Sequence, residues 1–251
     1  MKKLQVLCVG AIALAAVPAR AVEIDSYLTG VFFADGTKSN SPGFQNHAVG
    51  NTFIGSTIIP ERRNFFLFDV SGAAGPIVSA KLKLYVPKFP PDGGFGYISP
   101  DPTEDYLVTD TPFTADDIST PVIPTSVAAM MWSTFGTGMP YTLTTVSVDS
   151  MGTDLVLTLS GAALIKLNEA RLGTGKWAAT GRLTTLAGHP PLTDQLLFSF
   201  TDPTGAVAPT TPKPRLEYTV VPEPAGLAAL GLAMVAVLRK GIRASSRTFT
   251  P

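Results

Sequence analysis

The sequence predicts an all-β protein: a single antiparallel β-sandwich of jelly-roll type with one short helix. Three observations lead to this fold class. One segment is apolar throughout, the segment after it alternates between apolar and polar residues, and short β-prone segments recur along the chain between Gly- and Pro-rich turns. With 23 glycines and 22 prolines in 251 residues, turns are frequent enough for many short strands.

The strongest strand pattern begins at Arg63. Residues 64–70 (NFFLFDV) form a nearly continuous apolar run, which is typical of a strand covered on both faces. A turn cluster, SGAAGP, precedes residues 79–86, which alternate like a strand with one buried face. A strand buried on both faces that leads into one buried on a single face indicates layered sheets. The alternating segment places these apolar residues on one face: Ala80, Leu82, Leu84 and Val86.

The remaining strands are shorter. The first, residues 23–33, should be an edge strand, and residues 35–44 and 87–102 read as loops. Asp116 and Asp117 can open a helical turn, whereas residues 121–131 are apolar but irregular and predict no element. Further strands are expected at residues 53–55, 106–109, 141–148, 154–160, 176–180, 195–201 and 215–221.

The one short helix is expected after Ser160, which can cap its amino end. Helical spacing over the segment GAALIKLNEA predicts an amphipathic helix with one apolar side. The apolar side should contain Ala162, Leu164, Ile165, Leu167 and Leu172.

The amino-terminal 21 residues have the pattern of a signal peptide. Lys2 and Lys3 precede an apolar run at residues 6–17, and Ala19 and Ala21 supply small residues at the positions that signal peptidase requires, so cleavage is expected before Val22. Cys8, the only cysteine, lies in the apolar run as a small filler. The mature domain, residues 22–221, therefore has no disulfide and depends on its core for stability.

The net charge of zero hides an uneven distribution. Residues 22–221 contain 12 basic and 18 acidic side chains, a net charge of −6, while basic residues dominate both ends of the chain. An acidic surface disfavours nucleic acid and anionic lipid as partners, but it permits divalent cations or neutral sugars.

The carboxyl-terminal segment, residues 222–251, contains an uncharged run at residues 225–238. At about 1.5 Å per residue this run spans roughly 21 Å as a helix, less than the roughly 30 Å hydrocarbon layer, so a buried core helix is the alternative to a membrane helix. Arg239 and Lys240, followed by further arginines, favour the membrane helix because they form a cytoplasmic stop.

Pro222-Glu223-Pro224, the apolar run and then Arg239-Lys240 resemble the PEP-CTERM sorting-domain family of exported bacterial proteins. The resemblance implies that the tripeptide is a sorting signal for an exosortase-type membrane protease, in Gram-negative bacteria that make exopolysaccharide. Eleven residues follow Lys240, whereas family members usually end soon after the basic cluster. The resemblance to this family also implies an inner-membrane-anchored precursor that later reaches the cell surface or the extracellular matrix.

The body also resembles a domain that recurs among PEP-CTERM proteins. The similar segments cover about two-thirds of the mature chain, and they resemble packing motifs to which no catalytic residues are assigned. They are residues 63–69 (RNFFLFD), 79–85 (SAKLKLY), 135–138 (FGTG) and 157–159 (LTL) with the following helix.

Catalytic motifs are weak. His47 and His189 have no neighbour at metal-ligand spacing, and no G-x-S-x-G elbow is present, so we expect no enzyme. A glycan-active hydrolase with paired carboxylates remains an alternative, as does a structural Ca²⁺ site formed by Asp101, Glu104 and Asp105; solvated loop acids are the simpler interpretation. The acidic group is Asp101, Glu104, Asp105, Asp110, Asp116 and Asp117.

Sugar binding requires exposed aromatic rings. Tyr97, Trp132 and Tyr141 are the candidate sugar-contacting residues, with Phe95 and Trp177 as further aromatics, and burial of each ring is the alternative. The leading expectation is a noncatalytic surface or matrix protein associated with exopolysaccharide or biofilm; the alternative is a carbohydrate-binding module.

Overall fold

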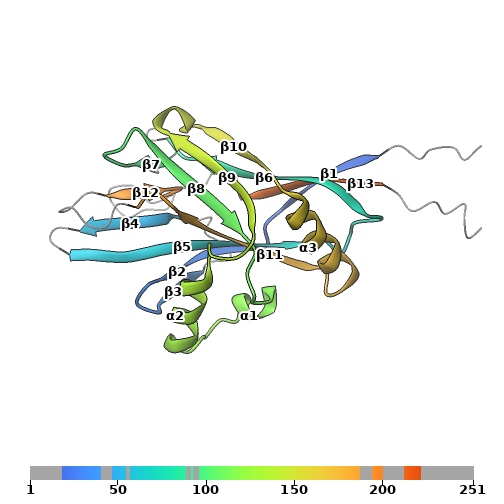
Figure 1. Ribbon diagram of the computed structural model, residues 1–251, viewed down its shortest axis with the longest axis horizontal. Helices are drawn as coiled ribbons and strands as arrows, with labels where there is room; N and C mark the ends of the chain where they lie inside the picture. The colour runs from blue at the N-terminus through green and yellow to red at the C-terminus, as the bar shows by residue number, and fades with distance from the viewer. Residues whose placement is uncertain are drawn as a thin grey trace, which may run out of the picture.

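The computed structural model describes residues 19–40, 47–54, 57–88, 92, 96–186, 194–199 and 212–221. The prediction of an all-β protein is confirmed, because these residues form two sheets in which every paired strand is antiparallel (Figure 1). The four-stranded sheet has the order β1 (Arg20–Asp25), β13 (Arg215–Val220), β6 (Ile77–Val86), β10 (Thr153–Thr158).

The second sheet has nine strands. Its long central strand is β5, which pairs with β4 and β2 as well as with β11. The main order is β7 (Tyr97–Ile98), β12 (Gln195–Leu197), β4 (Val49–Ile54), β5 (Thr57–Asp69), β11 (Lys176–Leu183), β8 (Thr103–Thr109), β9 (Pro140–Ser147). Off this order, β2 (Leu28–Phe33) pairs with β5 and with β3 (Lys38–Asn40).

Strand β5 is covered on both faces, as its apolar run predicts. Phe66 and Phe68 point into a core that also contains Leu82 and Leu84 of β6, so the two sheets share one interior in a sandwich-like arrangement. Phe65 and Leu67 point the other way, into a second core that involves two helices. The period of two in a strand assigns successive phenylalanines to opposite cores.

The prediction of a single helix is wrong. Three helices are present among the described residues: α1 (Ala115–Ser119), α2 (Thr125–Thr134) and α3 (Gly161–Leu172), with the short 3₁₀ turn η1 (Val148–Ser150). Helices α1 and α2 cover the outer side of β2 and β5, and α3 packs against β6, β9 and β11 (Figure 1). The helical turn expected at Asp116 is α1, which Thr114 caps through a capping box with Asp117.

Helix α2 was not predicted because its sequence lacks the usual signs of a helix. It carries no charge, its N-cap is Pro124, and no side chain caps its amino end. Only Ala128 and Met131 are buried, so the helix has no clear division into a polar side and an apolar side. Its carboxyl end is instead satisfied by a side chain more than 60 residues away, a tertiary contact that local patterning cannot reveal.

Helix α3 lies where it was expected, and its buried side was assigned correctly only in part: Leu167 is buried, and Ala162 and Leu164 pack against the core. Ala163 and Leu167 are buried, while Ile165 is 61% exposed and Leu172 is 74% exposed. Ser160 occupies the N-cap position without making a capping bond, because its hydroxyl donates to the Pro140 carbonyl instead. Contact with β6 and β11 selects the buried side, so helical spacing alone left two sides nearly equivalent.

The expected first strand, residues 23–33, is in fact two strands in different sheets. The chain leaves the four-stranded sheet after Asp25 and enters the nine-stranded sheet at Leu28. The Ser26 N–H donates to the carbonyl of Pro214, which precedes β13 of the four-stranded sheet. The Tyr27 N–H donates to the carbonyl of Leu67 in β5 of the nine-stranded sheet, and these two bonds fix the crossing. The edge position is confirmed for β1 alone.

The first and last described strands are neighbours. Strands β1 and β13 lie side by side (Figure 1) and pair antiparallel, with Arg20 opposite Val220 and Asp25 opposite Arg215. The amino end of β1 and the carboxyl end of β13 therefore lie at the same end of the sheet. Strand β1 begins at Arg20, two residues before the expected cleavage point at Val22.

Candidate functional site

A pocket of about 310 Å³ lies where α1, α3 and the start of β11 meet. Its walls are residues 111–116, the second half of α3 and Lys176, Trp177 and Ala178 of β11, and Tyr141 of β9 also lines it. This volume is at the lower end of the range for small-molecule pockets. Segments from four parts of the chain therefore build one concave site.

Two aromatic side chains form the inner wall of the pocket. The rings of Tyr141 and Trp177 are stacked, with centroids 5.7 Å apart and planes 26° apart. Phe68 supports Trp177 from the next strand at a centroid distance of 5.9 Å. Both pocket rings are almost completely buried, so they are fixed by the core and only part of each reaches the pocket.

Two ion pairs lie at the rim of the pocket. Lys176 Nζ of β11 lies 2.5 Å from Asp116 Oδ1 of α1, and Lys166 Nζ of α3 lies 2.8 Å from Glu169 Oε2. All four side chains line the pocket and are substantially exposed. The rim therefore offers hydrogen-bond donors and acceptors while its formal charge is zero.

The electrostatic environment agrees with this geometry. Burial raises the pKa of the Tyr141 hydroxyl, the Asp110 carboxylate raises it further, Trp177 opposes the shift and Glu169 adds to it. The pKa of Lys166 is raised, first by its hydrogen bond to Glu169 and then by the charge of that carboxylate. Tyr141 is thus a neutral hydrogen-bonding group at ordinary pH, and Lys166 is a cation.

The structure places the predicted sugar-contacting residues apart from one another. For Tyr97 and Tyr141 the alternative of ring burial holds, since they are 9% and 2% exposed. Tyr97 donates its hydroxyl to the Asp101 carbonyl at 2.6 Å, and only Tyr141 lines the pocket. Trp132 on α2 is partly buried, and one side of its ring is taken by the Arg63 guanidinium, 4.2 Å from the ring centroid.

The remaining aromatic candidates differ in outcome. Trp177 is buried in β11, as its strand position suggested, and it nevertheless lines the pocket. Phe95 lies outside the described residues. An exposed row of rings is therefore not formed by the described candidates, whereas a buried pair reaches a concave site.

The three residues proposed for Ca²⁺ do not converge. Glu104 is fully buried in β8, and its neighbour Asp105 lies on the opposite face, where Thr145 donates to it at 2.7 Å. Asp101 and Glu104 share one donor, Gln195 Nε2, at 3.1 and 3.0 Å. Among the described residues, no group of three His, Cys, Asp or Glu side chains is arranged to hold a metal ion.

The other acidic residues are used in local structure. Asp117 accepts from the Thr114 peptide N–H and hydroxyl at the start of α1, which lowers the pKa of Asp117. Asp110 accepts from the Met139 N–H at 2.7 Å. These carboxylates serve turns and caps at separate places, so the paired-carboxylate hydrolase remains a prediction with no site formed from them.

Neither histidine forms part of this pocket. His47 is fully buried between aromatic rings, with centroids 5.3 Å from Phe66 and 5.4 Å from Phe198. Its backbone carbonyl accepts from Asn64 Nδ2 at 2.7 Å, so this segment is held in the core. His189 lies outside the described residues.

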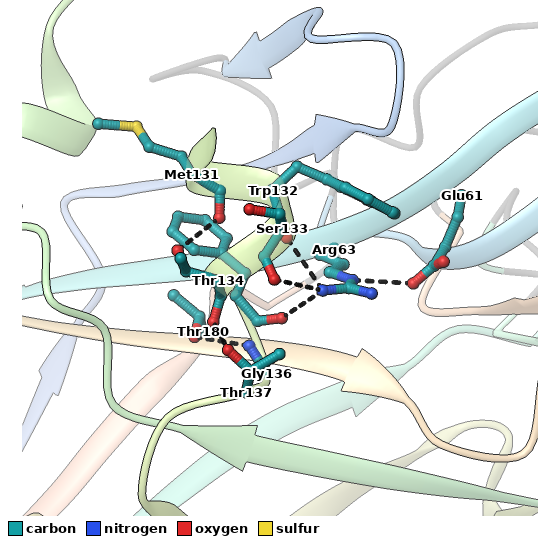
Figure 2. A network of polar contacts seen from close by, with 10 residues as sticks. Glu61, Arg63, Met131, Trp132, Ser133, Thr134, Gly136, Thr137 and Thr180 are labelled. Atoms are coloured by element: carbon teal, nitrogen blue, oxygen red, sulfur yellow. Dashed lines mark hydrogen bonds and ion pairs between the residues drawn. The ribbon is translucent and has the colours of Figure 1, made fainter. Parts of the chain in front are cut away.

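Sequence reasoning missed the polar network around Arg63, in which this β5 side chain caps α2 (Figure 2). Arg63 Nη1 donates to the carbonyls of Trp132, Ser133 and Phe135 at 3.0, 3.3 and 2.9 Å, and Nε donates to Glu61 at 2.8 Å. The segments RNFFLFD and FGTG, both of which resemble parts of the recurrent domain, thus contact one another. The only sequence sign of this contact was the position of Arg63, a charged residue directly before an apolar run.

The signal peptide core at residues 6–17, the sorting tripeptide Pro222-Glu223-Pro224 and the stop at Arg239-Lys240 lie outside the described residues. Within the described ranges, no helix has the length and apolar character needed to cross a membrane. Val221, the last described residue, donates its N–H to the Pro76 carbonyl at 3.1 Å, so the sheet holds the chain up to the tripeptide.

The fold and the pocket define a mostly β protein with two antiparallel sheets and a small concave site where α1, α3 and β11 meet. No protein-family model matches the chain, and no curated protein matches it significantly.

Proposed function

We propose that this chain is a noncatalytic exported protein of the cell surface or extracellular matrix, sorted through Pro222-Glu223-Pro224. In this proposal it is a PEP-CTERM protein whose precursor is held in the inner membrane by residues 225–238, with Arg239-Lys240 as the stop. An exosortase-type protease is the processing partner, and exopolysaccharide or a biofilm matrix is the destination. The two-sheet body is proposed to be a single sandwich of jelly-roll type.

The observation that best supports this proposal is the antiparallel pairing of β1 with β13, in which Val22, the expected mature amino terminus, lies opposite Tyr218. The segments that precede β1 and follow β13 leave from adjacent positions, so both can reach one membrane surface without crossing the body. The rest of the domain is free to lie on the outer side. Its excess of acidic residues would keep it from the anionic lipid surface.

Mass spectrometry of the protein recovered from an exopolysaccharide-producing Gram-negative host tests the proposal. We expect an amino terminus at Val22 and a carboxyl terminus within or next to residues 222–224 on the surface form. Replacement of Glu223 by Gln should retain the precursor in the membrane fraction. Glu217→Gln, on β13, removes a carboxylate six residues earlier and should leave sorting intact. A surface form that ends at Pro251 would contradict the proposal.

A second candidate function is carbohydrate binding. One observation favours it: the rim of a concave pocket carries paired charges that can hydrogen-bond to hydroxyl groups. This function is compatible with export, since a matrix protein benefits from holding the polysaccharide around it.

A further inference from the structure

The pocket between α1 and α3 has two chemically different parts. Inside lie the small accessible parts of Tyr141 and Trp177, with Phe113 as a partly buried apolar wall. Outside lie the pairs Lys176–Asp116 and Lys166–Glu169. A ligand that fills it must offer an apolar surface on one side and hydrogen-bonding groups on the other.

Trp177 belongs to a preformed wall of the pocket. It is 3% exposed, and its ring stacks on the ring of Tyr141, which is 2% exposed. The core therefore fixes both rings, so this wall of the pocket is formed before any ligand binds.

The preformed ion pairs restrict the ligand class. An anion would be attracted by the two ammonium groups but repelled by the two carboxylates, and a cation would meet the reverse, so the rim gives neither a net attraction. A hydroxyl group differs, because it can donate to a carboxylate and accept from the paired ammonium without breaking the pair. The neutral rim therefore favours an uncharged polyhydroxyl ligand.

We propose that this pocket binds a single neutral sugar ring, with its C–H groups against Phe113 and the small accessible parts of Tyr141 and Trp177, and its hydroxyls on Asp116, Lys176 and Glu169. The volume of about 310 Å³ fits one ring better than a chain of rings. The site therefore holds one unit or one end of a glycan. This inference rests on the second candidate function and not on the route of export.

The two tryptophans of the chain allow a direct measurement. In a Trp132→Phe background, Trp177 is the only indole, and its fluorescence reports on the pocket wall. The protein recovered from an expressing bacterium is titrated with D-glucose, D-galactose, D-mannose and N-acetylglucosamine, and with L-glutamine as a zwitterionic probe. We expect a saturable change with at least one sugar, with a dissociation constant of about 1 mM or below, and none with L-glutamine.

Two variants locate the binding. Asp116→Asn removes one rim carboxylate and should weaken binding about tenfold, the loss expected for one charge-assisted hydrogen bond. Thr174→Phe, at an exposed position that lines the pocket, should fill it and abolish the response. Glu217→Gln is the matched control, since it also removes a carboxylate paired with a lysine, Lys83, but on the four-stranded sheet away from the pocket.

Each outcome decides the inference. No saturable response to any of the four sugars overturns it, and a response to L-glutamine alone overturns the ligand class. Binding that persists in Thr174→Phe places the sugar elsewhere and overturns the site. Delivery to the cell surface is scored in the same strains, so a silent pocket on a correctly sorted protein removes this inference and leaves the export proposal standing.

Discussion

Arg63 Nη1 donates to the backbone carbonyl of Phe135 at 2.9 Å and thereby joins the middle of β5 to the end of α2, 72 residues later. The same nitrogen reaches two further carbonyls of α2, and the guanidinium lies over the Trp132 ring. A single buried cation thus satisfies the carboxyl end of a helix that has no basic residue in its last turn.

Arg63→Met should destabilise the protein by about 3 kcal/mol, because the α2 carbonyls lose their donors and Glu61 loses its partner. Arg63→Lys keeps the charge but not the fork of donors and should recover only part of this loss. Urea unfolding followed by circular dichroism measures both. Glu61→Gln is the control, with an expected cost below about 1 kcal/mol; equal losses in Met and Gln variants would contradict the capping role.

Gly50→Ala should destabilise the protein by at least about 2 kcal/mol. Gly50 has φ +115°, and a Cβ there would lie 2.0 Å from the Gln195 carbonyl oxygen, so the β4–β12 pair would have to separate. Gly72→Ala is the matched control, because a Cβ at Gly72 meets nothing within 4 Å. Thermal unfolding should show a lower Tm for Gly50→Ala alone.

Stability should fall as the pH rises from about 10 to about 12. Burial raises the pKa of Tyr27 to about 12, and burial together with the hydrogen bond to Asp92 raises the pKa of Tyr85 to about 12. In that window the unfolded chain has already lost protons that the folded chain retains, so unfolding becomes easier. Urea unfolding at a series of pH values measures the slope, and Tyr85→Phe should make it shallower. A flat profile would contradict these shifts.

Glu104→Ala should cost about 3 kcal/mol, because three side-chain donors lose the buried carboxylate that accepts from them. Glu104 Oε1 accepts from Ser99 Oγ at 2.5 Å and from Gln195 Nε2 at 3.0 Å, and Oε2 accepts from Thr185 Oγ1. Glu104→Gln retains the shape and should cost less. Calorimetric unfolding of both variants measures the difference.

The same contacts bear on calcium. Since neutral donors occupy both oxygens of Glu104, we expect EDTA to leave the Tm unchanged and added Ca²⁺ to give no increase. A rise in Tm with Ca²⁺ that Asp101→Asn abolishes would instead establish the metal site that the sequence suggests.

The sequence was most informative where burial imposes a strand period. The run at Phe65–Phe68 and the alternation through Leu82 and Leu84 located β5 and β6 and their buried faces correctly. The crossing at Ser26 was not visible, because its cause is hydrogen bonding to Pro214 and Leu67 in distant segments. Local patterning thus predicted most strands but not their division between the sheets.

The pocket was beyond sequence reasoning for the same physical reason. Tyr141 and Trp177 were both noted as aromatics, but nothing in their spacing indicates that their rings stack or that α1 and α3 close around them. Lys176 and Asp116, 60 residues apart, had no visible relationship before the fold brought them within 2.5 Å. Individual residue types were predictable, whereas their convergence depends on topology.

The adjacency of β1 and β13 also fixes an order of events during synthesis. Strand β13 emerges almost 200 residues after β1, so the edge of the four-stranded sheet stays open until nearly the whole domain has been made. On the proposed export route, Arg20 and Ala21 are an extended, unpaired peptide throughout that interval, which is the form a peptidase cleaves. Once Arg215–Val220 pairs with β1, the Ala21–Val22 peptide bond lies within a sheet. On this route, cleavage before Val22 must therefore come before β13 completes the fold.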